Sequence, residues 1–297
     1  MGKDAMIRIG IVGSDNSHAL AFARLANVDR VLGDRCRVVA ISGCDRTQTA
    51  DVAEKGEIAT IVERPEEMLG QIDLALVVDR HGDLHAGHAL PFIERGIPVF
   101  VDKPFAIKLD DCQRMLDTAE RSGSTIDSWS SLRFAPSTEA LAREAAGIGA
   151  IKAGHFTGPC DFESPYGGPF FYATHVIELA LRLIGEDVTT VTAKRHGGSV
   201  GVLVTWKSGA IASLALLKDA AYHFHVSLFG AEGMAAREIT GGSEAYEEAL
   251  KRIVRLVDGE KALSGAQILQ PIAMVHAIEE SLRDGGATIA LTPPPEP

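Results

Sequence analysis

The turn after the first apolar run of the sequence is the clearest place for phosphate-binding chemistry. Ile9–Gly13 reads as a buried strand that ends in a turn, and Ser14–His18 leads from that turn into a helical pattern. The start of a helix presents free backbone N–H groups, which favour a pyrophosphate. This is where a dinucleotide-binding fold places its first turn. The predicted cofactor contacts here are Gly13, Ser14, Asp15, Asn16, Ser17 and His18.

Only the first glycine of the fingerprint G-x-G-x-x-G is kept, at Gly13. Asp15 stands at the second glycine position and His18 at the third. A carboxylate beside a pyrophosphate is repulsive unless it turns away. Two interpretations therefore stay open: Asp15 contacts the cofactor, or Asp15 or Ser17 simply caps the following helix.

The end of the second strand decides which dinucleotide is bound, because an acid there usually contacts the ribose hydroxyls. Gly43 stands in that place, followed by Cys44, Asp45 and Arg46. Asp45 within reach of a ribose favours NAD, whereas Arg46 within reach of a 2′-phosphate favours NADP. The sequence leaves both cofactors open.

The segment after the fourth strand carries further polar residues at the same sheet edge. Asp79, Arg80 and His81 are predicted cofactor contacts, with Arg80 offsetting the charge of Asp15. His81, His85 and His88 are spaced as on one helix face, which is also a metal-ligand pattern. We predict no metal there, because the helix starts after His81 and no acid completes the set.

Two side chains are suited to chemistry at an alcohol or carbonyl carbon. Lys103 follows a strand and precedes Pro104, so its backbone is constrained and its ammonium can stabilise developing alkoxide charge. His175 lies in a helical stretch, and an imidazole titrates near neutrality. It suits a general base that takes the hydroxyl proton as a hydride leaves the carbon.

The elements that position these residues differ between the two halves of the chain. Up to about residue 127, short β-branched runs alternate with helical stretches, the pattern of a parallel sheet covered on both faces. The predicted strands are Ile7–Val12, Arg37–Ile41, Leu74–Val78, Pro98–Val101 and Thr125–Asp127. The predicted helices are Leu20–Val28, Leu84–Glu94 and Leu109–Arg121.

After Pro136 strand-like runs follow one another, as antiparallel neighbours do. The predicted strands are Ile151–Thr157, Val188–Lys194, Gly201–Trp206, Ala210–Leu217, His223–Phe229 and Thr288–Leu291. Helices are predicted at Phe171–Ile184, Glu244–Val257 and Gln267–Arg283, and a solvated tail at 293–297. We therefore expect an α/β chain with a Rossmann domain at 1–127, a doubly wound parallel sheet. An α+β domain at 128–297 has a large, mainly antiparallel open sheet for substrate and oligomerisation.

Composition excludes several classes of partner. The 29 Lys and Arg against 40 Asp and Glu give a formal charge of −11, a field that repels nucleic acid and anionic membranes. Long apolar runs are absent, and the four cysteines show no C-x-x-C pair. We expect a cytoplasmic protein whose partner is a small molecule.

Four motifs, the first three of them in register, resemble the glucose-fructose oxidoreductase / inositol dehydrogenase / MocA (Gfo/Idh/MocA) family. Leu84–Leu90 is similar to its L-H-x-x-x-A-L motif, and Asp102-Lys103-Pro104 to its E-K-P segment. Leu132–Pro136 resembles its R-F-x-P linker, and Gly167–Glu178 its G-G-x…D-x-G-x-H-x-x-D helix. The resemblance covers nearly the whole chain and indicates a divergent branch.

The resemblance implies roles for several residues. Lys103 and His175 would be the catalytic pair at the nicotinamide and the substrate carbinol, with a cis peptide bond after Lys103. Asp102 and His85 would contact the cofactor. Phe171 replaces an acid of the family, which puts the proton relay in doubt, and Tyr172 is the nearest hydroxyl in sequence.

The implied function is NAD(P)-dependent oxidation or reduction of a sugar, inositol or related polyol by a homodimer or homotetramer. Arg133, Glu163 and Tyr172 are predicted substrate contacts, although Arg133 and Glu163 also read as exposed loop charges. Two alternatives stay open: a dinucleotide or metabolite sensor that lost catalysis on the same fold, and a metal-dependent lyase that uses the histidines.

Overall fold

A computed structural model describes residues 5–291, which form two compact units. The first unit runs up to Trp129 and also includes Tyr246–Gly265, and the second comprises Ser130–Ala245 and the chain from Ala266 onward. The segment 246–265, expected in the C-terminal domain, thus packs with the N-terminal unit. The predicted tail at 293–297 lies outside the described residues.

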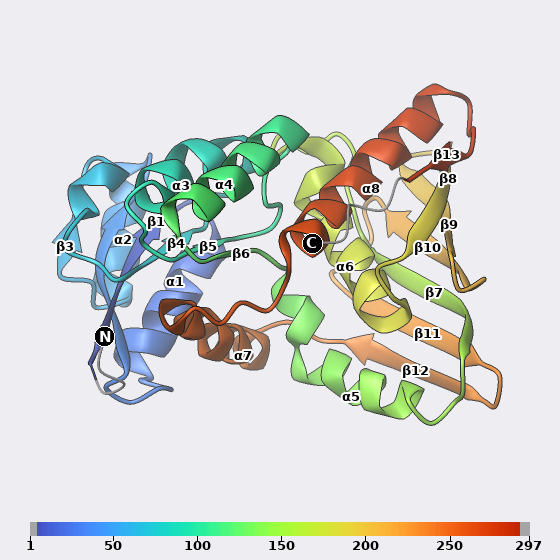
Figure 1. The fold of residues 1–297 in the computed structure, drawn as a ribbon, viewed down its shortest axis with the longest axis horizontal. Coiled ribbons are helices and arrows are strands. Elements are labelled where there is room, and N and C mark those ends of the chain that lie inside the picture. The colour runs from blue at the N-terminus through green and yellow to red at the C-terminus, as the bar shows by residue number, and fades with distance from the viewer. Residues whose placement is uncertain (1–4, 292–297) are drawn as a thin grey trace. The chain divides into compact units, whose positions relative to one another are not determined.

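The first unit is built on a parallel sheet of six strands in the order β3-β2-β1-β4-β5-β6 (Figure 1). The strands are β1 (Ile7–Val12), β2 (Cys36–Ser42), β3 (Thr60–Ile61), β4 (Leu74–Val77), β5 (Val99–Val101) and β6 (Ile126–Asp127). The strand order reverses beside β1. The carboxyl ends of β1 and β4 therefore border the crevice in which doubly wound folds bind their ligands.

Helices cover this sheet on both faces. They are α1 (Ser17–Ala23), α2 (Arg46–Lys55), α3 (His85–Ile93) and α4 (Leu109–Ser122). α3 and α4 pack together on one side of the sheet, and α1 lies on the other (Figure 1). Asp110 and Asp111 stabilise the start of α4, and Gly123 ends it in the left-handed conformation at φ +70°.

The second unit contains a seven-stranded sheet in the order β12-β11-β7-β10-β9-β8-β13 (Figure 1). The strands are β7 (Ile151–Pro159), β8 (Val188–His196), β9 (Ser199–Trp206), β10 (Ile211–Leu217), β11 (Phe224–Gly230), β12 (Met234–Ile239) and β13 (Ile289–Ala290). The sheet is mainly antiparallel, as predicted, but β7 and β10 run parallel. Parallel neighbours need a crossover, and here the chain passes through a helix and two strands between them.

One face of this sheet is covered by helices and the other is open. α5 (Pro136–Ala145), α6 (Ala173–Ile184) and α8 (Gly265–Arg283) lie on the covered side (Figure 1). Successive strand residues point to opposite faces, so Val202 and Val204 are buried while Leu203 between them is 46% exposed. Other exposed apolar side chains of the open face are Ile211, Phe229 and Met234.

Four elements were not expected from the sequence: α2, β3, α5 and β12. Both residues of β3 are exposed, and α5 buries only Thr138 and Leu141, so neither shows a clear apolar period. The predicted helix Glu244–Val257 is α7 (Ser243–Ile253) followed by the 3₁₀ turn Val254–Asp258. No helix within residues 5–291 combines the length and the apolar character that a bilayer crossing needs.

Candidate active site

Gly13 allows β1 and β4 to approach each other at the carboxyl edge of the first sheet. Its φ of +96° is a left-handed conformation that favours glycine. A Cβ at this position would lie 2.6 Å from the Cα of Asp79, the second residue after β4. The first turn is therefore shaped by a glycine that no other residue can replace without moving the backbone.

The side chains around position 43 explain why a glycine stands there. Oγ of Ser14 and Oγ1 of Thr49 form a buried hydrogen bond of 2.8 Å. A Cβ at position 43 would overlap Ser14 and lie 2.6 Å from Oγ1 of Thr49. The hydroxyl pair occupies the place in which a dinucleotide fold usually holds its ribose-binding acid, so an acid at position 43 would have to displace these side chains.

Asp15 turns toward the backbone after β4. Its Oδ1 accepts the backbone N–H of Arg80 at 3.1 Å. The interpretation of Asp15 or Ser17 as the helix cap is wrong, because Asn16 is the N-cap of α1 and accepts the N–H of His18 at 3.3 Å. Arg80 was predicted to offset the charge of Asp15. In the structure the backbone N–H of Arg80 does so.

Asp79 anchors a second set of contacts. Its carboxylate is buried, and Oδ2 lies 2.8 Å from Nδ1 of His88. His85 is fully buried, with Nε2 2.8 Å from the carbonyl oxygen of Asp79 and Nδ1 2.7 Å from that of Pro104. His85 thereby ties the end of β4 to the segment after Lys103, while Nδ1 of His81 accepts the N–H of Asp83 at 3.2 Å.

The three histidines thus hydrogen-bond to separate groups. Within residues 5–291 no cluster of three or more His, Cys, Asp or Glu side chains is arranged to hold a metal ion. The structure gives no support to a metal-dependent lyase.

The pair of His88 and Asp79 predicts a pH dependence of stability. The hydrogen bond and charge of Asp79 raise the pKa of His88, while burial opposes that change. A histidine whose pKa is higher in the folded than in the unfolded protein stabilises the fold. This contribution is complete below the unfolded pKa of about 6.5 and is lost as pH rises through the folded pKa. We expect the free energy of unfolding lost in His88→Gln to be largest below about pH 6.5 and to shrink as pH rises through the folded pKa of His88. Urea denaturation at each pH measures it, and a pH-independent difference would contradict the prediction.

Asp102 and Lys103 follow β5 at the same edge, and both are 3% exposed. Oδ2 of Asp102 lies 2.7 Å from Nδ1 of His18, an ion-pair distance without ideal hydrogen-bond alignment, and accepts Nδ2 of Asn16 at 3.3 Å. Burial by itself raises the pKa of Asp102, but the charge of His18, with help from Lys103 and His85, lowers it to about 2. Asp102 is therefore a carboxylate, and the peptide bond from Lys103 to Pro104 is cis, as the resemblance implies.

A pocket of about 410 Å³ opens at the carboxyl ends of β2 and β3. It is lined by Gly43, Cys44, Arg46, Thr49, Ile61, Val62 and Glu63. Its position beside the first turn is that of the adenosine half of a dinucleotide in a Rossmann fold. Arg46 and Glu63 form an ion pair at its rim, whereas the Asp45 carboxylate caps α2 by accepting the N–H of Gln48 at 2.9 Å.

These features fit a dinucleotide. Gly13 lets the first turn lie close to the backbone of Asp79, the charge of Asp15 is directed to a backbone N–H, and the pocket lies where a Rossmann fold holds adenosine. The carboxyl edge of the first unit brings together Gly13, Ser14, Asp15, Asn16, His18, Asp79, His85 and Asp102. Ser17 is exposed at the first position of α1.

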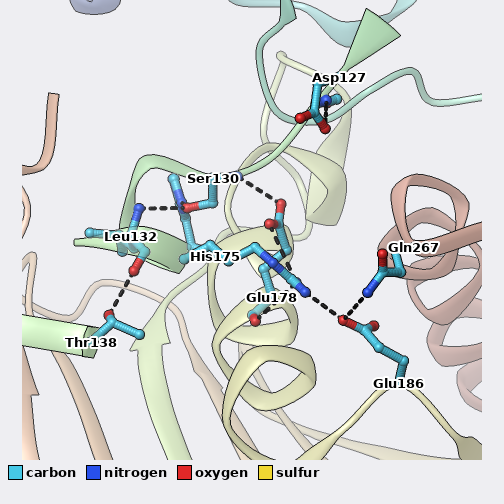
Figure 2. A network of polar contacts seen from close by, with 10 residues as sticks. Asp127, Ser130, Leu132, Thr138, His175, Glu178, Glu186 and Gln267 are labelled. Atoms are coloured by element: carbon cyan, nitrogen blue, oxygen red, sulfur yellow. Dashed lines mark hydrogen bonds and ion pairs between the residues drawn. The ribbon is translucent and has the colours of Figure 1, made fainter. Parts of the chain in front are cut away.

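In the second unit His175 lies on the first turn of α6 and is 3% exposed. Its Nδ1 lies 2.6 Å from Oγ of Ser130 (Figure 2). The backbone N–H of Ser130 donates to Oε1 of Glu178 at 2.9 Å. Ser130 was not predicted as a site residue, because its contact with His175 joins positions 45 apart in sequence.

Aromatic rings surround His175 within this unit. The ring of Tyr172 lies 5.6 Å from that of His175, and the ring of Phe224 lies 5.5 Å from it. Phe171, which replaces the family's acid, is buried and packs between Tyr166 and Tyr172 at 5.3 and 4.7 Å. Position 171 thus extends an apolar wall instead of supplying a carboxylate.

The other predicted substrate contacts lie in ion pairs. Arg133 is buried, at 2% exposure, and pairs with Glu178 and Glu186, so its reading as an exposed loop charge is wrong. Glu163 is exposed and pairs with Arg195 at 2.9 Å. Arg133 therefore stabilises the start of the second unit.

Taken together, the two units define a class of protein: a Rossmann-type dinucleotide fold joined to a mixed, mainly antiparallel sheet domain. Residues 7–128 match the model of an oxidoreductase family with an NAD-binding Rossmann fold. This match agrees with the resemblance: residues 7–128 are similar to the Gfo/Idh/MocA oxidoreductase family. The predicted class of cofactor, a nicotinamide adenine dinucleotide, is confirmed with it.

Sequence relatives include several inositol 2-dehydrogenases. Inositol 2-dehydrogenase 3 of Saccharopolyspora erythraea is 31% identical over 121 residues, which are 40% of this chain and 34% of the relative. Inositol 2-dehydrogenase of Ralstonia nicotianae is 30% identical over 122 residues, 40% of this chain and 35% of that one. The chain spans about a third of the length of the curated relatives it matches.

Solved structures extend the likeness in fold to both units. Myo-inositol dehydrogenase of Corynebacterium glutamicum has a TM-score of 0.81 at 18% identity and covers 98% of this chain and 100% of its own. Scyllo-inositol dehydrogenase of Lactobacillus casei, solved with NAD(H) and scyllo-inositol, has a TM-score of 0.82 at 14% identity and covers 96% and 99%. The comparisons give no support to the sensor alternative.

Proposed function

We propose that this protein is an NAD-dependent dehydrogenase that oxidises a CH–OH group of a cyclic polyol such as an inositol, or reduces the corresponding ketone. The observation that carries the proposal is the carboxyl edge of the first sheet. Its residues fit a dinucleotide, and Lys103 lies there beside the Asp102 carboxylate. The curated relatives that match about two fifths of this chain are inositol 2-dehydrogenases, which supports the substrate class.

The chemistry divides between the two units. A bound NAD would supply the hydride acceptor for the carbinol carbon. Lys103 stabilises the negative charge that develops on the substrate oxygen, and Nε2 of His175 takes the hydroxyl proton. Tyr172, whose ring packs on His175, is the proposed wall against which the substrate ring lies.

A substrate screen tests this function. Absorbance of reduced nicotinamide is followed with NAD and each of myo-inositol, scyllo-inositol and a set of aldoses and open-chain polyols. We expect turnover with one or more cyclic polyols and loss of it in His175→Gln. Tight binding of NAD without turnover of any polyol or sugar would overturn the proposal.

The pocket rim favours NAD over NADP. Arg46 is the cation nearest in sequence to the missing ribose acid, but its guanidinium is already paired with Glu63. A 2′-phosphate would place a further negative charge beside the Glu63 carboxylate, whereas a ribose hydroxyl would not. We therefore propose NAD as the cofactor.

Removing that carboxylate tests the preference. In Glu63→Gln the Arg46 guanidinium is released, and we expect the affinity for NADP to rise several-fold, about 1 kcal/mol, with little change for NAD. Isothermal titration measures both affinities. Glu54→Gln, an exposed residue on α2 away from the pocket lining, is the control. Tighter binding of NADP than NAD by the native protein would contradict the preference.

We further propose that the open face of the second sheet pairs with a second copy of the chain. A flat face that exposes Leu203, Ile211 and Phe229 by 46 to 48% each is suited to a symmetric apolar interface. Leu203→Asp is expected to lower the molar mass measured by light scattering to that of a monomer. Leu109→Asp, at a leucine of similar exposure in the first unit, should leave it unchanged. A monomeric native protein would refute the proposal.

A cytoplasmic location completes the proposal. The four cysteines of the chain are unbridged, and three of them are buried, as in proteins of a reducing compartment. The location is tested by cell fractionation.

A further inference from the structure

Two charged side chains lie at opposite edges of the open face of the second sheet. Successive residues of a strand point to opposite faces, so Lys194 on β8 and Glu238 on β12 share the open face with Leu203 and Phe229. Both charged residues are exposed. On the described strands between them, β11, β7, β10 and β9, no Asp, Glu, Lys or Arg side chain points to this face. Depletion of charge in the middle of a face is typical of the core of a protein interface.

Backbone pairing places the lysine and the glutamate in one row across the sheet (Figure 1). The row crosses neighbouring strands at residues that pair with one another: Glu238, His225, Thr157, Ala215, Gly201 and Lys194. Its midpoint falls between β7 and β10. A half-turn about an axis that is parallel to the strands at this midpoint lays the row end for end on the row of a second copy. Lys194 then lies over the partner's Glu238, and Glu238 lies over the partner's Lys194.

The same half-turn matches large side chains with small ones. A second row of paired residues contains Met234, Phe229, Ala153, Ile211, Thr205 and Thr190. When this row is turned end for end, Phe229 lies over the partner's Thr205, and Ile211 lies over the partner's Ala153. Facing layers interdigitate best where bulky side chains oppose small ones. The face is therefore self-complementary, as a two-fold interface requires.

The size of the face suits a dimer. The strands from β12 to β8 are about 4.8 Å apart and have about seven residues of about 3.3 Å each, which makes a face of roughly 29 by 23 Å. Each partner of a stable dimer buries roughly 600 to 1,000 Å². The face is thus large enough to hold a second copy.

The imidazole in the middle of the face keeps its hydrogen bonds when the face is covered. Nδ1 of His155 lies 2.7 Å from Oγ of Ser213, and Nε2 lies 2.9 Å from Oγ1 of Thr157. Burial of a polar group is costly when the group loses its hydrogen-bond partners. Both partners of this imidazole belong to its own chain and its own sheet, so a second copy can exclude water without breaking either contact.

We propose that two copies of the chain pair through their open faces about a two-fold axis that runs parallel to the strands, between β7 and β10. Lys194 of each copy then forms an ion pair with the partner's Glu238, at both ends of the interface. Within its own chain, Oε1 of Glu238 contacts Nδ1 of His223 at 2.5 Å, so Oε2 is the oxygen that meets the lysine. This proposal rests on the proposed pairing of the open faces, but not on the dehydrogenase activity.

The charges distinguish this axis from an axis that runs across the strands. Sheets packed face to face keep their strands within about 30° of one another, which both axes allow. An axis across the strands brings each edge of the sheet onto the same edge of the partner. Lys194 would then approach β8 of the partner and Glu238 would approach its β12, so the opposite charges would not meet.

Charge reversal tests the pairing. Lys194→Glu and Glu238→Lys each place like charges at both ends of the interface. We expect each substitution to raise the dissociation constant of the dimer about tenfold at low ionic strength, because two symmetric contacts change from attractive to repulsive. The chain that carries both substitutions has opposite charges again and should dissociate like the native dimer. Sedimentation velocity over a dilution series measures these constants, and the differences should shrink at high salt.

A mixture of the two variants excludes loss of the fold as the cause. In a dimer of one Lys194→Glu chain and one Glu238→Lys chain, both ends join opposite charges. With a short tag on one chain, native mass spectrometry separates the mixed dimer from the two homodimers. We expect mixed dimers to outnumber both homodimers, whereas tagged and untagged native chains should mix statistically.

Arg195→Glu is the matched control. It makes the same change of charge at the next residue of β8, but Arg195 points to the covered face, where it pairs with Glu163. We expect the native dissociation constant.

Three results decide the matter. A native dimer that neither single substitution weakens, or that the double substitution does not restore, would overturn the proposed axis. A monomeric native chain would mean that another molecule covers the face, and would overturn the pairing itself. Absence of turnover with any polyol or sugar would refute the proposed function and leave the result on the dimer unchanged.

Discussion

Replacing Lys103 by methionine is expected to lower kcat by about 10²- to 10³-fold, because the substrate oxygen loses its charge partner in the transition state. Methionine keeps the length and the buried apolar stem of the lysine, which is 3% exposed, so packing changes little. The Asp102 carboxylate next to it keeps its contact with His18. The KM for the polyol should change far less than kcat, since the charge acts mainly in the transition state.

Steady-state kinetics with the polyol found in the substrate screen measure this effect, and quenching of protein fluorescence reports NAD binding separately. Lys108→Met is the matched control, because Lys108 lies five residues further on in an exposed ion pair with Asp83. We expect its kcat to equal that of the native protein. Native turnover by Lys103→Met would remove the lysine from the mechanism.

Gly13→Ala is expected to abolish dinucleotide binding and to lower the melting temperature. The new Cβ would lie 2.6 Å from Cα of Asp79, and the φ of +96° is strained for alanine. The turn can relieve the overlap only by moving β1 away from the segment after β4. That movement breaks the bond from the Arg80 N–H to Asp15 and changes the shape of the pyrophosphate site.

Thermal unfolding with and without NAD measures both consequences, since a ligand that binds the native state raises its melting temperature. Gly33→Ala provides the control, because its φ of +58° is also left-handed but no atom lies within 4 Å of the added Cβ. We expect Gly33→Ala to lose a little stability and to keep the full stabilisation by NAD. If Gly13→Ala keeps that stabilisation, the first turn is not the pyrophosphate site.

Much of the fold could be predicted because its signals are local. The predicted strand Ile7–Val12 has the observed bounds, and Leu74–Val78 and Leu109–Arg121 differ from β4 and α4 by one residue each. Buried parallel strands read as apolar runs, and amphipathic helices carry a regular apolar period. β3 and α5 were not predicted, because short or mostly exposed elements have neither signal.

Residues of the candidate site could be predicted where they lie within a recognisable sequence motif. Asp102, Lys103 and His175 were named from their neighbours in sequence, and Gly13 from the strand before it. Arg133 was read as a substrate contact or a loop charge because its partners are 45 and 53 residues away. Its burial between Glu178 and Glu186 comes from the packing of α6 against the 3₁₀ turn Ser131–Phe134.

The sequence by itself determined the class of fold, the place of the first turn and the lysine after β5, since each depends on residues that are neighbours along the chain. Only the tertiary structure decided why position 43 is a glycine, where the charge of Asp15 is directed and which hydroxyl holds His175. The physical reason is the range of the contacts. Oγ of Ser14 meets Thr49, and Oγ of Ser130 meets His175, across 35 and 45 residues that no periodicity connects.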